Sequence, residues 1–349
     1  MKIITCASFY GSGSSALTDL VAEYSCVKDL TNYEFRFLYD LDGVSDLEHY
    51  LCECHDRHNA GHALKRFKRL SEFNAGTFFN ARYETFFNNQ YMKLTRKFID
   101  SITDFSYPGW WFYDAYDKGK VLYYILIQWD KILRKLTNGK KSILARERIF
   151  CSHPSQEKFI ESVQNYVASL MQAANPEGLP FLEVDQLVPS QNLNRILRYF
   201  SDEITVFIVD RDPRDIYTSN RFYWKENICP TDDVNVFCDW FLYTRKSGKV
   251  ESYDTNQVIR LRFEDMIYKY DETVAKIEML TGLDNSLHSM QFKKFNPQQS
   301  VNNTQIWKKH NIEADIRVIE ERLAEYLYPF DEVSRDTVSG VKQEGGKIF

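Results

Sequence analysis

The 349-residue sequence lacks any uncharged apolar run long enough to cross a membrane, which takes about 20 residues. The apolar run at its start, residues 1–8, is also too short for the apolar region of a signal peptide. We therefore expect a soluble protein of cytoplasmic localisation with no transmembrane segment.

A basic excess is missing as well. The chain has 44 Lys and Arg residues against 49 Asp and Glu residues, which gives a formal net charge of −5. A protein devoted to nucleic acid carries a strong positive balance. We therefore expect no nucleic-acid partner, although a local basic pocket is compatible with this average.

The cysteines show no disulfide framework, because they number seven and are irregularly spaced. This usage is typical of reduced thiols in an intracellular protein. One group, Cys52, Cys54, His55, His58 and His62, is dense enough to suggest a metal site. Its order is not a standard zinc-ligand spacing, so we expect no metal.

Strand-like apolar runs alternate with segments of helical periodicity along much of the chain. The strand-like runs are 3–8, 33–39, 181–184, 204–209 and 258–262, and the helical segments are 14–24, 190–200 and 271–280. Strands that alternate with helices predict an α/β fold with a central parallel sheet flanked by helices.

Aromatic residues make up 15% of the chain and are unevenly distributed: residues 73–130 hold 18 of the 53. This stretch belongs to a long, mostly helical segment that breaks the α/β pattern. We predict a helical, aromatic-rich insertion at about 61–154, within a core of about 1–60 and 155–310. Together they would form a single domain over 1–333, followed by a flexible tail, 334–349.

The first strand leads into a loop of small residues, Gly11, Ser12, Gly13, Ser14 and Ser15, and then into a helix. Small residues let the backbone approach a phosphate, and a helix N-terminus offers N–H groups and a favourable dipole. The loop is not a Walker A motif, because no Lys follows the second glycine. It also matches a Rossmann fingerprint ending at Ala16, and a plain strand-to-helix turn is a further alternative.

A second motif follows the β-branched run 204–209. Arg211 stands at the carboxyl end of this strand, where α/β folds bind ligands, and Ser219 lies two turns into a helix that begins at Pro213. A guanidinium fork and a hydroxyl at this spacing can grip one phosphate. The alternative is a solvated charge cluster at a helix start.

These motifs resemble those of the PAPS-dependent sulfotransferases of bacterial type, which have a P-loop-like fold. Gly11–Ala16 is similar to the family's 5′-phosphosulfate loop, and Arg211-Asp212-Pro213-Arg214-Asp215…Ser219 is similar to its 3′-phosphate motif. Leu261–Met266 with Gly282-Leu283, and Ser300…Trp307-Lys308, look like the family's late strand end and its nucleotide-closing loop. The resemblance covers residues 2–40 and about 180–310.

The resemblance implies an enzyme that moves the sulfuryl group of PAPS (3′-phosphoadenosine 5′-phosphosulfate) in line to a hydroxyl acceptor, releases PAP and needs no metal. It implies that the loop residues 11–15 hold the 5′-phosphosulfate and that Arg211 and Ser219 hold the 3′-phosphate, which Lys308 helps to close. The acceptor stays open between a glycan and a sterol-like or small alcohol. Some rings of the insertion would line its pocket.

The chain departs from the family pattern at Gly11, where many relatives carry a Lys or Arg that assists the leaving group. Either backbone N–H groups replace that cation or it comes from elsewhere. The candidates are Arg36, Lys65, Arg66 and Lys308.

Three residues are candidates for the general base. Glu34 stands at the distance from the loop at which glycan-modifying relatives carry a Glu, and it is the first choice. Asp185, at the end of the strand before the 3′-phosphate motif, is second, and His153 is third. Glu34 could instead pair with Arg36, and Asp185 could cap a helix.

Other functions stay open at this point. A Rossmann-type nucleotide-binding enzyme would use the first loop but leaves Arg211 and Ser219 without a role. A P-loop kinase lacks its Walker lysine. A catalytically inactive PAP-binding homologue is compatible with Gly11.

Overall fold

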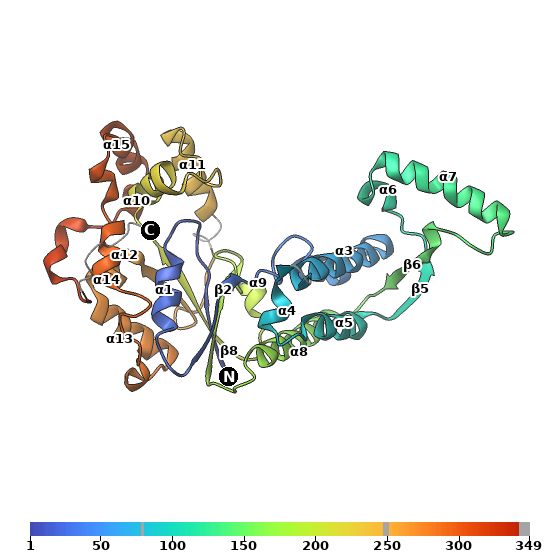
Figure 1. Cartoon of the computed structure of the whole chain (residues 1–349), viewed down its shortest axis with the longest axis horizontal. Helices are drawn as coiled ribbons and strands as arrows, with labels where there is room; N and C mark the ends of the chain where they lie inside the picture. Colours follow the sequence, from blue (N-terminus) through green and yellow to red (C-terminus); the bar gives the residue numbers. More distant parts are fainter. Residues whose placement is uncertain (78–79, 247–250, 342–349) are drawn as a thin grey trace. The chain divides into compact units, whose positions relative to one another are not determined.

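Five parallel strands form one sheet, part of which is labelled in Figure 1. Their order in the sheet is β2–β7–β1–β8–β9. They are β1 (Lys2–Cys6), β2 (Val27–Glu34), β7 (Phe181–Asp185), β8 (Glu203–Asp210) and β9 (Val258–Arg262). The central strand β1 pairs with both neighbours, with Ile4 opposite Glu183 on one side and Thr205 on the other. The predicted parallel sheet flanked by helices is confirmed.

The computed structural model describes residues 1–77, 80–246 and 251–341, which fall into two compact units. The first comprises Met1–Arg36, Glu177–Leu197 and Asp202–Phe349, and the second comprises Phe37–Pro176 and Arg198–Ser201. The helical insertion predicted at 61–154 lies within the second unit, which begins earlier, at Phe37.

Apolar strands and helices build the core of the first unit. Strand β8 is an almost continuous β-branched and aromatic run, as expected for a strand buried on both faces. One apolar cluster joins the sheet to α1 (Ser14–Val21), α12 (Phe263–Tyr268) and α13 (Tyr270–Thr281). A second cluster joins α10 (Pro213–Thr218), α11 (Val234–Arg245) and α15 (Glu313–Arg322).

Short elements complete the first unit. They include α9 (Leu193–Leu197), the π-helical turn η3 (Ser219–Trp224), α14 (Pro297–Ser300) and the 3-10 turns η5 (Val301–Asn303) and η6 (Ile306–Lys309). Further 3-10 turns are η4 (Asn285–Leu287), η7 (Ala324–Tyr326), η8 (Phe330–Glu332) and η9 (Arg335–Thr337). Within the predicted tail, Val338 is buried and Asn296 donates a hydrogen bond to the carbonyl of Val341 (2.8 Å). Residues 342–349 lie outside the described residues.

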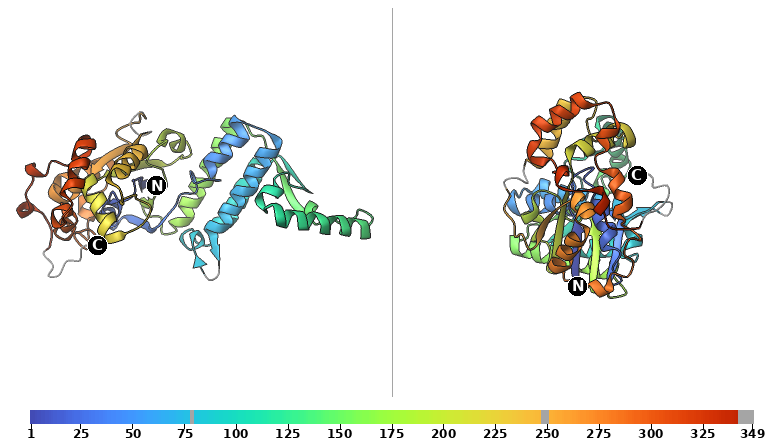
Figure 2. Two further views of the ribbon diagram at one scale, coloured as in Figure 1. Left: turned by 90° about the horizontal axis from the view of Figure 1, so that it is seen from above. Right: turned by 90° about the vertical axis from the view of Figure 1, so that its left-hand side faces the viewer.

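Three long helices form the body of the second unit (Figure 2). They are α3 (Arg57–Ala75), α5 (Tyr91–Ile102) and α8 (Gln156–Ala174). Aromatic rings fill the space between them, since Phe98 stacks on Tyr166 at a centroid distance of 4.7 Å and also meets Phe67 edge-on. Much of the aromatic excess is therefore packing between helices.

The rest of the second unit consists of smaller elements. An antiparallel ribbon, β5 (Phe105–Gly109) and β6 (Glu147–Cys151), carries α6 (Asp114–Asp117), α7 (Lys120–Leu136) and the 3-10 turn η2 (Leu144–Arg146) between its strands. The others are α2 (Val44–Glu48), the π-helical turn η1 (His49–Glu53), β3 (Gly76–Thr77), β4 (Asn80–Ala81) and α4 (Tyr83–Phe86).

Strand β2 differs from the prediction, which placed a strand at 33–39. The strand runs over Val27–Glu34 at the end of the sheet, and its sequence, VKDLTNYE, is largely polar. An edge strand has one side open, so it does not need the continuous apolar run by which the central strands are recognised.

No helix among residues 1–77, 80–246 and 251–341 is long and apolar enough to span a membrane.

The close approach of Gly13 to Phe263 gives a testable prediction for stability. Gly13 has φ +83°, and a Cβ there would lie 2.6 Å from Cδ2 of Phe263. Gly178 has a similar φ, +70°, but nothing within 4 Å of its Cβ position. We expect Gly178→Ala to cost about 1–2 kcal/mol for its backbone conformation alone. Gly13→Ala should cost about 1–3 kcal/mol more, because the ring must move.

Urea unfolding of the two variants and the wild type measures this difference. Equal losses in Gly13→Ala and Gly178→Ala would show that the first loop does not rest tightly on Phe263.

Candidate functional site

The carboxyl edge of the sheet gathers residues that lie far apart in the sequence. Glu34 ends β2, Asp185 ends β7, the small-residue loop follows β1, and Arg211 directly follows β8. Because these strands are parallel and adjacent in that order, the four features line one edge of the sheet. This edge is the place where α/β sheets bind ligands.

The loop between β1 and α1 is shaped by two glycines. Gly11 and Gly13 have φ values of +74° and +83°, which L-amino acids with a side chain rarely adopt. Gly13 is the N-cap of α1, and no side chain caps this helix. The start of α1 therefore keeps backbone N–H groups that can donate hydrogen bonds to an anion.

The serines of this loop differ in exposure. Ser12 is buried, and its hydroxyl has no hydrogen-bond partner among the described residues. Ser14 is half-buried and Ser15 is exposed. A buried hydroxyl without a partner is costly in a folded protein, and a bound anion would supply the missing bond for Ser12.

Arg211 joins three segments of the first unit. Its Nη1 donates to the carbonyl of Gly11 (3.3 Å), and its Nη2 donates to Oγ of Ser219 (3.3 Å) and to the carbonyl of Asn303 (2.7 Å). The guanidinium also lies 4.9 Å from the ring centre of Phe263, the residue against which Gly13 rests. The structure thus brings the predicted residues Gly11, Arg211 and Ser219 together.

Arg211 is buried among three carboxyl groups that are also buried, Asp212, Asp215 and Glu264. Burial lowers the pKa of Arg211, and these acids act in the opposite direction. Burial raises the pKa of Asp215, although Arg211 opposes the rise, and burial with the neighbouring Asp212 raises the pKa of Glu264 to about 8.

The positive charge of Arg211 is therefore only partly compensated near neutral pH. Asp212 is further engaged by Arg214 (Nη2–Oδ2 2.8 Å) and by the backbone N–H of Tyr328. The Nε atom of Arg211 has no partner among the described residues. A cation with incomplete compensation and an unused donor is suited to bind an anion.

Asp215 holds the C-terminal segment to this site, because its carboxylate accepts from the N–H groups of Gln305 and Ile306 (3.0 and 2.8 Å). Lys308 follows on the same segment, in η6, but its side chain is exposed and donates to Oε1 of Gln305 (2.6 Å). The segment of Lys308 is thus tied to Arg211, while its ammonium group contacts neither Arg211 nor Ser219 in the structure.

Two of the predicted bases are neighbours. Glu34 and Asp185 are paired across the β2–β7 ladder. The Glu34 side chain is 59% exposed and lies 3.7 Å from Nη1 of Arg36, the ion pair considered as its alternative role. Asp185 Oδ1 is buried without a hydrogen-bond partner among the described residues. Burial, and then the charge of Glu34, raise the pKa of Asp185 to about 7.

The third predicted base and two candidate cations belong to the second unit. His153 is exposed and stacks on His55 at a centroid distance of 3.7 Å. Lys65 pairs with Asp114 (3.0 Å) and Arg66 with Asp42 (2.8 Å). These contacts give His153, Lys65 and Arg66 roles within their own unit.

One buried cation near the first loop, Arg245 at the end of α11, is not predicted from the sequence. This residue is buried, and its guanidinium lies 4.2 Å from the ring centre of Phe9, at the start of the first loop, and 3.5 Å from that of Phe241. Burial lowers its pKa to about 10. No motif marks Arg245 in the sequence, because its surroundings come from distant segments.

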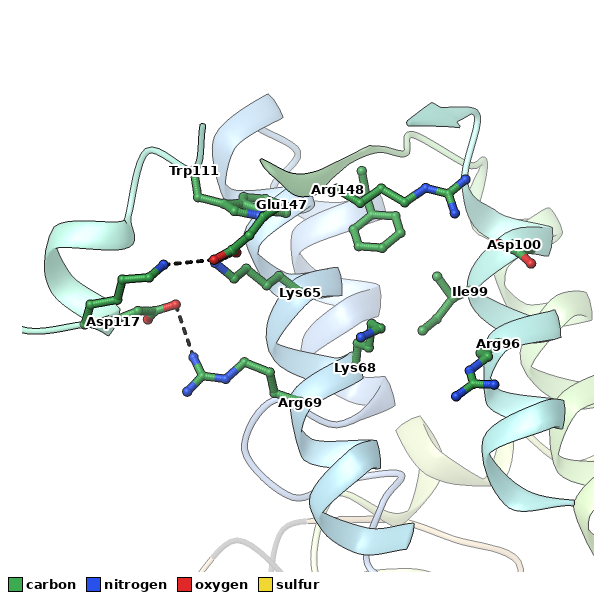
Figure 3. A pocket seen from close by; sticks show the side chains of 12 residues that line it. Lys65, Lys68, Arg69, Arg96, Ile99, Asp100, Trp111, Asp117, Glu147 and Arg148 are labelled. Atoms are coloured by element: carbon green, nitrogen blue, oxygen red, sulfur yellow. Dashed lines mark hydrogen bonds and ion pairs between the residues drawn. The ribbon is translucent and has the colours of Figure 1, made fainter. Parts of the chain in front are cut away.

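The second unit contains a basic pocket of about 640 Å³ between α3, α5 and β6 (Figure 3). Ile99, Trp111 and Phe150 give it apolar walls. Six basic and three acidic side chains also line it: Lys65, Lys68, Arg69, Arg96, Lys118 and Arg148, with Asp100, Asp117 and Glu147. Such a lining can hold an anionic group beside an apolar or ring-shaped moiety.

Within the described ranges, no group of three or more His, Cys, Asp and Glu side chains is arranged to hold a metal ion. The seven cysteines are free thiols.

No family model matches the chain, and no curated protein matches it. Among solved structures, the chain is similar to the sulfotransferase domain of the Synechococcus PCC 7002 olefin synthase, with 13% identity and a TM-score of 0.43 over 94% of this chain and 96% of that one. It is also similar to the sulfotransferase STF1 from Mycobacterium tuberculosis H37Rv, with 12% identity and a TM-score of 0.34 over 93% and 76%. At this level of likeness, function has to be inferred from the residues of the site.

The raised pKa of Asp185 predicts a particular pH dependence of stability. The folded chain keeps this proton up to about pH 7, whereas an unfolded Asp loses it near its ordinary pKa of 3.8. Between these values the folded state binds more protons, so Asp185 makes stability fall as the pH rises. The side chain of the Asp185→Asn variant cannot ionise. Between pH 5 and pH 8, the free energy of unfolding of this variant should therefore rise by about 2 kcal/mol relative to that of the wild type.

Urea unfolding of both proteins across this pH range measures the gain. A constant difference between the two curves would mean that Asp185 titrates normally.

Proposed function

We propose that this chain is a PAPS-dependent sulfotransferase that transfers a sulfuryl group to a hydroxyl acceptor and releases PAP. The observation that carries the proposal is the meeting of two phosphate-type motifs, 200 positions apart, through the hydrogen bonds of Arg211 to Gly11 and Ser219. PAPS carries two anionic groups, a 5′-phosphosulfate and a 3′-phosphate. A site for PAPS needs two adjacent anion subsites, and these motifs supply one each.

The first loop would hold the 5′-phosphosulfate. Its backbone N–H groups, the hydroxyls of Ser12, Ser14 and Ser15, and the positive end of α1 are the available donors. Because Gly11 replaces the usual basic residue, we assign the stabilisation of the leaving phosphate to these N–H groups and to the helix dipole.

Arg211 and Ser219 would hold the 3′-phosphate. To do so, the Arg211 fork exchanges a bond to a backbone carbonyl for bonds to phosphate oxygens, which are stronger because both partners are charged. Lys308, on the segment anchored by Asp215, would close over the nucleotide.

Transfer proceeds in line. The acceptor oxygen forms a bond to sulfur while the bond between sulfur and the 5′-phosphate oxygen breaks, and the acceptor proton passes to a carboxylate base. Glu34 is our first candidate because it is exposed enough to reach an acceptor. Asp185 is the second, because a base with a pKa near 7 is well matched to neutral pH.

The acceptor is a hydroxyl compound, for which we propose a glycan or a hydrophobic alcohol. A cytoplasmic reaction is consistent with seven free thiols. The lack of a basic residue at Gly11 favours one alternative, an inactive homologue that binds PAP without transferring a sulfuryl group. Screening acceptors with labelled PAPS separates the enzyme from this homologue.

Loss of Arg211 should remove the 3′-phosphate subsite. We expect Arg211→Ala to weaken PAP binding by about 100-fold or more, because two or more charge-assisted hydrogen bonds are lost. Isothermal titration of PAP against purified protein measures the effect.

Arg322→Ala is the matched control, because Arg322 pairs with Asp239 on the surface, between α15 and α11. Arg211→Lys, which keeps the charge, should bind PAP with an intermediate affinity. If Arg211→Ala binds PAP as tightly as the wild type, or if the wild type does not bind PAP, the proposal is wrong.

Substitution of the base should separate binding from chemistry. We expect Glu34→Gln to bind PAP normally but to lower kcat by about 100-fold or more, the usual share of a general base. Wild-type turnover in Glu34→Gln would exclude Glu34. A kcat/KM profile with its midpoint near pH 7, lost in Asp185→Asn, would then assign the role to Asp185.

A further inference from the structure

Helix α7 (Lys120–Leu136) presents an unpartnered apolar row. The side chains of Leu122, Ile125, Trp129, Ile132 and Leu136 are between 46% and 79% exposed. Their spacing alternates between three and four residues, which places them on one face of the helix. Val121, which borders this row, is also exposed, and so is Tyr124 further around the helix.

A different side of α7 connects it to its own unit. The helix packs against α6 and η2, and it extends away from α3, α5 and α8 (Figure 1). Asp130 is its one buried residue and accepts hydrogen bonds from the Ser142 hydroxyl (2.7 Å) and the backbone N–H of Ile143 (2.6 Å). The apolar row is therefore not needed to hold α7 in place.

The exposed charges of α7 all have one sign. Lys120, Lys131 and Lys135 form a separate row with Tyr124, about a third of a turn around the helix from the apolar row. Three further cations, Arg134, Lys140 and Lys141, lie nearby, and the charge of Arg134 acts on Asp130, one turn before it. Within the described residues, none of the six cations forms an ion pair. The single acid of the helix, Asp130, is buried. This basic surface belongs to a chain whose net charge is −5.

The row has the spacing of a coiled-coil seam, so a second copy of the chain is one conceivable occupant. In such a pair Lys135 would flank the seam, Lys120 and Lys131 would lie on the outer faces, and α7 offers no exposed acid to pair with any of them. A bilayer with anionic lipids fits better. Its acyl boundary accepts the apolar row, and its headgroups pair with the cations. Tyr124 and Trp129 suit the boundary between the two.

We propose that α7 binds flat on a membrane surface that contains anionic lipid, with its apolar row in the acyl boundary. The aromatic surface continues beyond the helix, since the exposed Trp110 stacks near Tyr123 at a centroid distance of 6.5 Å. This inference does not depend on the proposed sulfotransferase activity.

Vesicle co-sedimentation of the full chain tests the proposal. The probes are vesicles of phosphatidylcholine alone and vesicles of phosphatidylcholine and phosphatidylglycerol in equal parts. We expect the wild type to bind the mixed vesicles about 10-fold or more tightly than the neutral ones. The double variant Ile125→Glu/Trp129→Glu should lose binding to both, because charges enter the apolar row.

Two control variants separate this surface from general effects. Lys131→Glu/Lys135→Glu should weaken binding to the mixed vesicles by about 10-fold or more. Lys93→Glu/Lys97→Glu, with the same spacing on the exposed side of α5, should not. Met279→Glu, on α13 and 75% exposed, controls for the apolar change. Because the substituted side chains are exposed, thermal unfolding should stay unchanged, which confirms that each variant folds.

Three outcomes would overturn the proposal. The wild type fails to bind the mixed vesicles, the α7 variants bind as the wild type does, or the control variants lose binding equally. Analytical ultracentrifugation identifies the alternative occupant. A concentration-dependent dimer that Ile125→Glu/Trp129→Glu dissociates, without vesicle binding, would assign the row to a second copy. PAP titration of the same variants keeps this result separate from the proposed function.

Discussion

The buried guanidinium of Arg211 is the interaction on which the candidate site depends. It connects the first loop, the start of η3 and the C-terminal segment through Gly11, Ser219 and Asn303. Taking a cation out of water is costly unless it is paired and hydrogen-bonded. Here the pairing is incomplete, because Glu264 and Asp215 are themselves so buried that their pKa values rise. An anionic ligand would complete the compensation, so the same burial that costs stability in the free chain prepares the site for binding.

The parallel sheet explains why the other candidate residues lie where they do. Each strand delivers its last residue to the same edge, so Glu34 and Asp185 become neighbours although 151 positions separate them. Their proximity has a chemical consequence, since the charge of Glu34 adds to the effect of burial on Asp185. The two carboxyl groups differ mainly in exposure, and that difference is what makes their roles separable by mutation.

The aromatic excess of the insertion has two origins. Rings such as Phe98 and Tyr166 are packed between the long helices of the second unit and serve its stability. Others, such as Trp129 on α7, are largely exposed in an apolar row. The expectation that some of these rings line an acceptor pocket stays a prediction. Trp111 and Phe150, in the wall of the basic pocket, are the rings placed where that role is possible.

The sequence alone determined the features that depend on neighbours along the chain. The glycine loop, the buried strand before Arg211, the helix that begins at Pro213 and the central strands follow from local conformational preference and apolar patterning. Other features needed the tertiary structure. Strand β2 is polar because it lies at the edge of the sheet, and the burial of Asp185 and Arg245 comes from segments distant in sequence. The exposure of α7 could not be predicted from the sequence either, because an apolar helical face has the same pattern whether or not another element covers it.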